Sequence, residues 1–321
     1  MRKTILGLAL GAIALPATAN ADCGAVSITE MNWASAQVIT TVSKFIMEQG
    51  YGCEVTVVPS DTVPAVASVA ENGEPDIVTE LWVNSAGDAY KRLESEGKVV
   101  QLGEVLDPGG VEGWWIPKYL ADEHPELKTI EGVMANPELV GGQFNNCPSG
   151  WGCRVINDNL IKALKIEDSG IEVFNHGSGE TLATSMASAY QDKKPWFGYY
   201  WSPTALLGKY EMTRVDLGDY KAKVHARNAN AEANNPGVSD YPSAAVVTAV
   251  TADFKDREPE IADLMSKLTI KTSDMSSVLA WKDENNASAE EAAVYYLTEY
   301  KDEWKGWLSD DAAQKLSKVL Q

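Results

Sequence analysis

The chain has 321 residues, of which 45% are hydrophobic and 23% are charged, and its formal net charge is −19 at pH 7. This length accommodates two domains with hydrophobic cores, and the negative charge excludes binding to nucleic acid or to anionic lipid through a basic surface. Tryptophan occurs 10 times against only 5 phenylalanines, which indicates a specific use for indole rings.

Residues 1–21 are typical of an export signal. Arg2 and Lys3 precede an apolar run over 5–15 that is too short to span a membrane, and the segment 19–21 supplies a small-x-small cleavage site. Cleavage there leaves a cysteine at the second position of the mature chain, whereas a lipid anchor requires it at the first. We therefore expect a soluble periplasmic protein.

The first third of the chain alternates strands with helices. Strands are predicted over 26–30, 54–58 and 76–81, with a helix that ends at Gly50 and a second helix over 62–71 between them. This β-α-β-α-β order predicts a mostly parallel sheet with helices packed against it.

Two tryptophans follow strands of this predicted sheet. Trp33 comes shortly after the first strand, and Trp82 comes directly after the third. Ligands of parallel α/β sheets gather beyond the carboxyl ends of the strands. We therefore interpret both rings as binding-site side chains rather than as core residues.

A further strand over 111–116 carries the chain into a second domain. The pattern beyond it predicts a segment over 139–144 that leads into a cysteine loop, helices over 158–164 and 181–191, an aromatic strand over 195–201, a polar loop over 227–242, a returning strand over 244–250 and helices to the C-terminus. The predicted domains are 22–112 with 243–321 for the first and 113–242 for the second.

The segment from Cys147 to Cys153 reads C-P-S-G-W-G-C and presents Trp151 at the tip of a small loop. Four cysteines in an exported chain allow two disulfides in three pairings, and proximity favours Cys23–Cys53 and Cys147–Cys153. A zinc site is disfavoured because the chain has no C-x-x-C pair and only three histidines. An ordinary loop stapled for stability is the alternative to a binding loop.

Four tryptophans have small or polar neighbours, namely Trp33, Trp82, Trp151 and Trp201. A core tryptophan normally lies among apolar residues, so these four predict a cage of exposed indole faces. Such a cage binds a methylated ammonium group, which has no N–H to donate, and each face contributes about 0.5–2 kcal/mol.

Motifs of catalysis and of cofactor binding are absent from the sequence. It contains no G-x-S-x-G elbow, P-loop, H-E-x-x-H or dinucleotide fingerprint. We therefore predict a binding protein that is not an enzyme and carries no cofactor. The alternatives are a sensory or chemoreceptor module that uses the same pocket, and an extracytoplasmic enzyme that acts on methylated amines.

The segment C-P-S-G-W-G-C resembles the disulfide-closed tryptophan loop of the glycine betaine-binding proteins of bacterial ABC importers. The segments Y-Y-W-S-P-T, with Trp201, and E-L-W-V-N, with Trp82, resemble other box residues of that family. N-W-A-S-A, with Trp33, is similar to an extra aromatic of the choline-type branch, and G-W-W-I-P-K-Y over 113–119 also has the look of the family. The similarity runs from about residue 24 to the C-terminus.

The resemblance implies a two-lobed periplasmic binding protein, type II-like, in which each lobe is a mostly parallel α/β sheet flanked by helices and the ligand cleft lies between the lobes. Its partners would be a methylated amine and the permease and ATPase of an importer, and the chain would act as a monomer. Trp82, Trp151 and Trp201 would form the cage, with Trp33 as a fourth wall. The backbone N–H groups of Gly152 and Cys153 would face the ligand's negative oxygen.

Glu112 departs from the family's pattern. It lies on the crossing strand near the expected cleft, where an unpaired carboxylate would repel a carboxylate ligand and favour choline or a compact amine oxide. The alternative is a Glu112 that points to solvent or pairs with a lysine. A four-walled cage together with the retained N–H donors suggests a short ligand with an oxygen next to its trimethylated nitrogen, which trimethylamine N-oxide fits slightly better than glycine betaine, the ligand of the parent family. One of the adjacent Trp114 and Trp115 is expected to face the cleft, and Trp115 is included among the ligand-binding candidates.

The polar loop contains four side chains that could offer oxygen ligands to calcium, namely Asn230, Glu232, Asn234 and Asp240. Their spacing matches no EF-hand, and an ordinary polar loop is the preferred interpretation. We therefore predict no metal site.

Overall fold

The computed structural model describes residues 23–320, and the predicted export signal lies outside them. The strands are β1 (Ala25–Met31), β2 (Glu54–Ser60), β3 (Ile77–Trp82), β4 (Val99–Pro117), β5 (Gln143–Asn146), β6 (Glu172–Asn175), β7 (Gly198–Ser202), β8 (Met212–Arg214), β9 (Ser243–Thr251) and β10 (Ile270–Lys271). They form one sheet in the order β2-β1-β3-β9-β4-β7-β5-β6, with β8 and β10 paired to β4.

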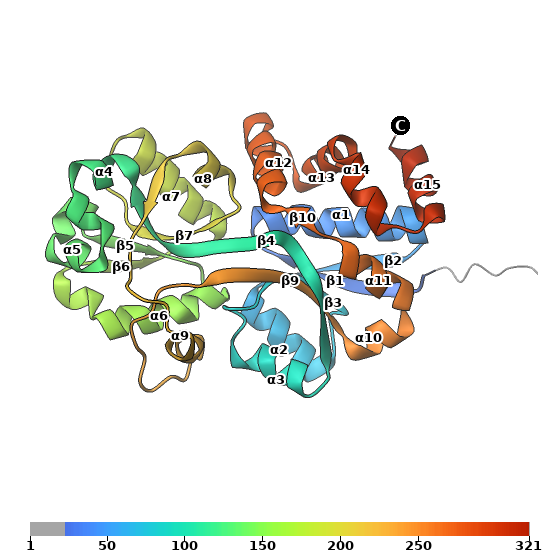
Figure 1. Ribbon diagram of the computed structural model, residues 1–321, viewed down its shortest axis with the longest axis horizontal. Coiled ribbons are helices and arrows are strands. Elements are labelled where there is room, and N and C mark those ends of the chain that lie inside the picture. The colour runs from blue at the N-terminus through green and yellow to red at the C-terminus, as the bar shows by residue number, and fades with distance from the viewer. Residues whose placement is uncertain (1–22, 321) are drawn as a thin grey trace, which may run out of the picture.

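Helices flank this sheet, so the predicted α/β class is confirmed (Figure 1). The α-helices are α1 (Ala34–Tyr51), α2 (Thr62–Asn72), α3 (Gly87–Ser95), α4 (Lys118–Glu123), α5 (Ile130–Ala135), α6 (Gly152–Leu164), α7 (Gly179–Gln191), α8 (Ala205–Lys209), α9 (Ala222–Asn228), α10 (Ala252–Arg257), α11 (Pro259–Lys267), α12 (Thr272–Asn285), α13 (Ala289–Glu299), α14 (Lys301–Trp304) and α15 (Asp310–Val319). Within residues 23–320, every helix is too short or too polar to cross a membrane.

The elements fall into two groups in Figure 1. The first lobe contains β1–β3, α1–α3 and α10–α15, and the second lobe contains β5–β7 and α4–α9. Strands β4 and β9 pass from one lobe to the other and pair antiparallel along much of their length. The sites at the end of β3, on β4 and at the end of β7 therefore come close together. The boundaries at residues 112/113 and 242/243 remain a prediction.

Helix α1 illustrates how the sequence pattern produces the first lobe. Val38, Val42 and Ile46 share one buried face, as the helical spacing predicts. Burying each such side chain contributes about 1.5–3 kcal/mol. The predicted end at Gly50 is one residue too early. The helix continues to Tyr51 and is closed by Gly52 at φ 75°.

Two predicted strand limits are wrong. The crossing strand begins at Val99 rather than Val111, because Asp107-Pro108-Gly109 is accommodated by irregular pairing between β4 and β9 instead of ending the strand. Strand β2 continues through Pro59, which is tolerated because β2 lies at the edge of the sheet.

Both favoured disulfides are present, and no cysteine of the described chain is free. Cys23–Cys53 joins the start of β1 to the start of β2, with 4.4 Å between the Cα atoms. Cys147–Cys153 closes the tryptophan loop of the second lobe, with 6.5 Å between the Cα atoms.

Candidate functional site

A small cavity of about 20 Å³ lies where the two lobes meet. It is lined by Trp33, Thr62, Trp82, Ser85, Glu112, Trp151, Gly152, Cys153, Tyr199 and Trp201. All four tryptophans that the sequence singled out are therefore brought together, along with the predicted Glu112, Gly152 and Cys153. We call the four indole rings the cage.

The two rings of the first lobe are anchored to one carboxylate. The indole N–H of Trp33 donates to Oε1 of Glu80 at 2.6 Å, and that of Trp82 donates to the same oxygen at 3.4 Å. The hydroxyl of Ser35 donates to it as well, at 2.8 Å. The edges of both rings are thus fixed inside the lobe, which leaves their faces free to form walls.

A glycine makes room for one of these walls. A Cβ atom on Gly110 of β4 would lie only 2.2 Å from the Trp82 ring. Any larger residue at this position would displace the ring, so the main chain of the crossing strand packs directly against the Trp82 ring.

The rings of the second lobe meet the others edge-on. The Trp151 ring lies 5.1 Å from the Trp33 ring and 5.0 Å from the Trp201 ring, at interplanar angles of 72° and 86°. The indole N–H of Trp151 donates to Oδ1 of Asn32 in the first lobe at 2.5 Å. Trp151 therefore completes the cage and also links the lobes.

The cysteine loop leads directly into a helix. Trp151 is the N-cap residue of α6, and Gly152 and Cys153 are its first two residues. Within residues 23–320, neither of their amide N–H groups donates to another group. Free N–H groups and the positive end of the helix dipole together favour a negative atom at this wall of the cavity. The helical start predicted at residue 158 is six residues too late.

Gly152 also permits the close approach of the lobes. A Cβ atom at this position would lie 2.1 Å from the carbonyl oxygen of Ser85 in the first lobe. The backbone N–H of Val63 donates to the carbonyl of Gly150 at 3.0 Å across the same junction. The loop is therefore fitted against the first lobe by backbone contacts as well as by Trp151.

Glu112 lies in the cavity wall with only 2% of its surface exposed. The hydroxyl of Tyr199 donates to it at 2.7 Å, Ser85 at 3.2 Å, and the amide of Asn84 also donates. The alternative of a solvent-facing or lysine-paired Glu112 is wrong. Burial raises the pKa of this carboxyl, against the opposing effects of these donors and of the Arg214 charge.

Trp115 does not line the cavity, so the structure gives no support to its predicted ligand contact. Its indole N–H donates to the carbonyl of Tyr200 at 3.0 Å. Trp114 is fully buried, packs against Phe144 and donates to Oδ1 of Asn157 at 2.8 Å. The register of β4 with β7 is unbroken from Val111 to Trp115, so the two adjacent rings point to opposite faces of the sheet, with Trp114 in the core and Trp115 half-buried.

Two of the four residues considered for calcium use their side-chain oxygens in other contacts. The carboxylate of Asp240 pairs with Arg214 at 2.7 Å. The side-chain oxygen of Asn230 accepts from the backbone N–H of Glu232 at 2.9 Å. In the described part of the chain, no three or more His, Cys, Asp or Glu residues are clustered as a metal ion requires.

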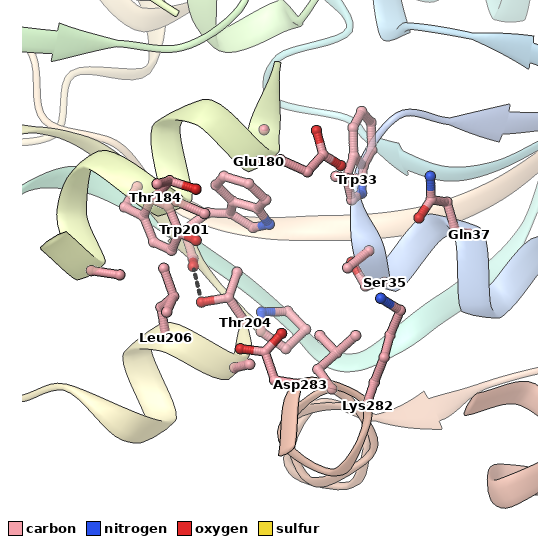
Figure 2. Close-up of a pocket in the computed structure, with 18 residues that line it drawn as sticks. Trp33, Ser35, Gln37, Glu180, Thr184, Trp201, Thr204, Leu206, Lys282 and Asp283 are labelled. Atoms are coloured by element: carbon pink, nitrogen blue, oxygen red, sulfur yellow. Dashed lines mark hydrogen bonds between the residues drawn. The ribbon is translucent and has the colours of Figure 1, made fainter. Parts of the chain in front are cut away.

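A larger cavity of about 350 Å³ lies beside the cage and shares Trp33 and Trp201 with it (Figure 2). Its other walls come from α1 and α12 of the first lobe and from α7 and α8 of the second. In Figure 2, Lys282 and Asp283 project from α12 on one side, and Glu180 of α7 lies on the side of Trp33. The cage is thus adjacent to a roomier space between the lobes.

Comparison with known proteins identifies the family. The model of the substrate binding domain of ABC-type glycine betaine transport systems matches residues 24–299. The chain belongs to this family. It is a family of transport binding proteins, as the resemblance of the tryptophan motifs implies.

Individual relatives are distant in sequence but similar in fold. The chain is 18% identical to the glycine betaine/proline betaine-binding periplasmic protein of Escherichia coli K12, over 76% of this chain and 77% of that protein. A glycine betaine, L-proline-binding protein from Borrelia burgdorferi superposes with a TM-score of 0.73 at 15% identity, covering 91% and 99% of the two chains. A choline-binding protein in complex with choline gives 0.73 at 18% identity, covering 93% and 99%.

Several residues of the site were not predicted from the sequence. Tyr199 precedes Trp201 by two residues on β7, so strand alternation could have placed both on one face. Ser85 follows Trp82 in the turn after β3 and could have been included with it. Glu80 could also have been identified from the sequence, because it is an acid within a strand that is otherwise buried and uncharged.

Proposed function

We propose that the protein captures a small methylated amine in the cage and delivers it to the permease and ATPase of an importer. The ligand we favour is trimethylamine N-oxide, before glycine betaine and choline. The observation that carries this choice is the position of Glu112 in the wall of the cavity that Gly152 and Cys153 also line.

The cage supports recognition of the methylated nitrogen. Its cationic methyl groups would contact the indole faces, each of which contributes about 0.5–2 kcal/mol, and more when water is excluded. Each of the four rings has no more than 6% of its surface exposed. Affinity for the nitrogen would therefore come from cation–π contacts in a site that is largely screened from solvent.

The opposite side of the cavity would select the oxygen. An ionised Glu112 would repel the carboxylate of glycine betaine, and a protonated Glu112 could donate a hydrogen bond to an N-oxide oxygen. Burial raises the pKa of Glu112, which favours the protonated form. Trimethylamine N-oxide carries its oxygen on the nitrogen itself, so it would need both interactions within a shorter distance than glycine betaine or choline would.

Ligand entry would require the lobes to separate, because the cage walls come from both of them. The larger cavity, which shares Trp33 and Trp201 with the cage, is the route we propose. A periplasmic location agrees with the export signal predicted from the sequence and with the name of the Escherichia coli relative, a periplasmic binding protein.

The test is Glu112→Gln, measured by calorimetric titration with trimethylamine N-oxide and glycine betaine. The substitution removes the negative charge that repels a carboxylate and keeps an N–H donor for the N-oxide oxygen, so the preference for the N-oxide over glycine betaine should fall about tenfold, equivalent to about 1.4 kcal/mol. Glu104→Gln is the matched control, since Glu104 is exposed on the same strand. An unchanged preference in a folded Glu112→Gln protein would refute the role of Glu112.

A further inference from the structure

Glu80 occupies an unusual backbone position behind the cage. It is completely buried within β3, and its φ of 48° lies in the left-handed region that non-glycine residues seldom adopt. The pairing of β3 with β9 is irregular between Val78 and Leu81, where Glu80 lies. Such a conformation has a cost that the surrounding structure must offset, so the direction of this side chain is closely specified.

The two carboxyl oxygens of Glu80 have different surroundings. Oε1 accepts from the indole N–H groups of Trp33 and Trp82 and from the hydroxyl of Ser35. Oε2 is buried and has no hydrogen-bond partner. The carboxyl therefore holds two cage walls in place through Oε1. Its Oε2 either carries a proton or bears negative charge that no hydrogen bond compensates.

No cation pairs with Glu80 in the described chain. Strand β9 has no charged residue, and Glu80 is the one charged residue of β3. The charged residues of α1 are Lys44 and Glu48, which pair with each other at 3.5 Å. A buried carboxylate without a cation is costly, so a positive ligand in the cage would relieve that cost.

Two other acids lie on the strands around this position. On β1, Glu30 lines a separate cavity with Glu290, and burial, followed by the charge of Glu290, raises the pKa of Glu30. On β4, Glu112 lies in the cavity wall and is bonded to Tyr199, Ser85 and Asn84. The same cage ligand could thus influence Glu112 and Glu80, and the two must be separated by experiment.

We propose that Glu80 is a positioning residue that also serves as the counter-charge of the cage, so that binding of a methylated cation between Trp33 and Trp82 releases the carboxyl proton to solvent. This inference rests on the proposed function. The cation would act on Glu80 through the two rings, since an indole that donates to an anionic oxygen gains electron density on its face and attracts the cation more strongly.

The expected pH dependence has a definite sign. Burial raises the pKa of Glu80 to about 7, so near neutral pH the carboxyl is partly protonated. A cation in the cage favours the ionised form and lowers this pKa. Affinity for a permanent cation should therefore increase as the pH rises through 7, with proton release on binding.

The experiment is calorimetric titration of choline, a permanent cation, at pH 6, 7 and 8. At pH 7 the titration is repeated in two buffers with different ionisation enthalpies. We expect a fraction of a proton to be released at pH 7 and the affinity to rise several-fold from pH 6 to 8. In Glu80→Gln, which keeps an acceptor for the indoles, both effects should vanish and affinity at pH 8 should fall about tenfold. Glu112→Gln should retain the Glu80-dependent proton release, and Glu30→Gln is the control for an acid outside the site.

The outcomes separate this inference from the proposed function. Binding without proton release, and with equal affinity in Glu80→Gln, would refute the role of Glu80 as a counter-charge. It would leave the proposed binding of the ligand in the cage intact. No binding of choline, glycine betaine or trimethylamine N-oxide to the wild type would overturn both. If Glu80→Gln does not fold, the two-buffer measurement on Glu112→Gln decides, because proton release by that variant cannot come from Glu112.

Discussion

The two halves of the cage are held in different ways. Trp33 and Trp82 donate to Glu80 within the first lobe, so their half is built before the lobes meet. Trp151 belongs to the second lobe but donates to Asn32 of the first. The first half is therefore a rigid platform, and the second half is completed by closure of the lobes.

The two halves should therefore respond differently to substitution, in ligand affinity and in closure of the lobes. Substitutions in the first half should alter the positions of its rings and the charge behind them, with little effect on the contacts between the lobes. Changes in the second half should weaken both the wall and the closed arrangement. Three measurements test this difference between the two halves of the cage.

The largest expected effect is on stability and concerns the first half. The pKa of Glu80 is raised from 4.5 to about 7, so the folded protein retains a proton that the unfolded chain has lost. Its contribution to the free energy of unfolding is present below pH 4.5 and is lost as the pH rises through 7, by about 3 kcal/mol. Denaturant unfolding of the ligand-free wild type and of Glu80→Gln at pH 5 and 8 measures it. Equal pH dependence in the two proteins would contradict an ionisable, buried Glu80.

The next effect concerns the wall that joins the lobes. Trp151→Ala removes an indole face and the hydrogen bond to Asn32, so affinity should fall at least tenfold, and up to about 30-fold for 2 kcal/mol. Trp281→Ala is the control, because Trp281 stacks on Tyr295 at a distance from the cage. Wild-type affinity in a folded Trp151→Ala protein, measured by calorimetry, would refute the cage.

The smallest effect concerns closure without loss of any ring. In Gly152→Ala the added methyl group would meet the carbonyl oxygen of Ser85, so the lobes could not approach as closely. We expect about a fivefold to tenfold loss of affinity, seen mainly as faster ligand release in stopped-flow fluorescence. Gly177→Ala, where a Cβ atom meets nothing within 4 Å, should bind normally. Normal release by Gly152→Ala would mean that this junction does not govern closure.

The sequence was informative where local pattern determines position. Strand and helix alternation predicted the parallel strands of the first lobe, and the small neighbours of Trp82, Trp151 and Trp201 singled out rings that line one cavity, although all three are buried and not exposed as predicted. These features depend on residues that are close together in the chain, which is why they could be read from it.

The remaining features depend on contacts between distant residues. The partners of Glu80 include Trp33, which is 47 positions away, so its anchoring role could not follow from spacing. Trp115 points away from the face of Glu112 because the pairing of β4 with β7 has no bulge between these residues, and that pairing joins distant parts of the chain. The length of β4 was missed because Pro108 and Gly109 usually end a strand, whereas here the irregular pairing with β9 accommodates them.

The most direct test of the account is calorimetric titration of trimethylamine N-oxide, glycine betaine, choline and carnitine into the oxidised chain without residues 1–21. We predict that trimethylamine N-oxide binds with a Kd of about 1 μM or below, near 8 kcal/mol, and that the other three bind more weakly. Heat from none of the four would contradict the central claim, because the four tryptophans would then form a packed core and not a ligand cage.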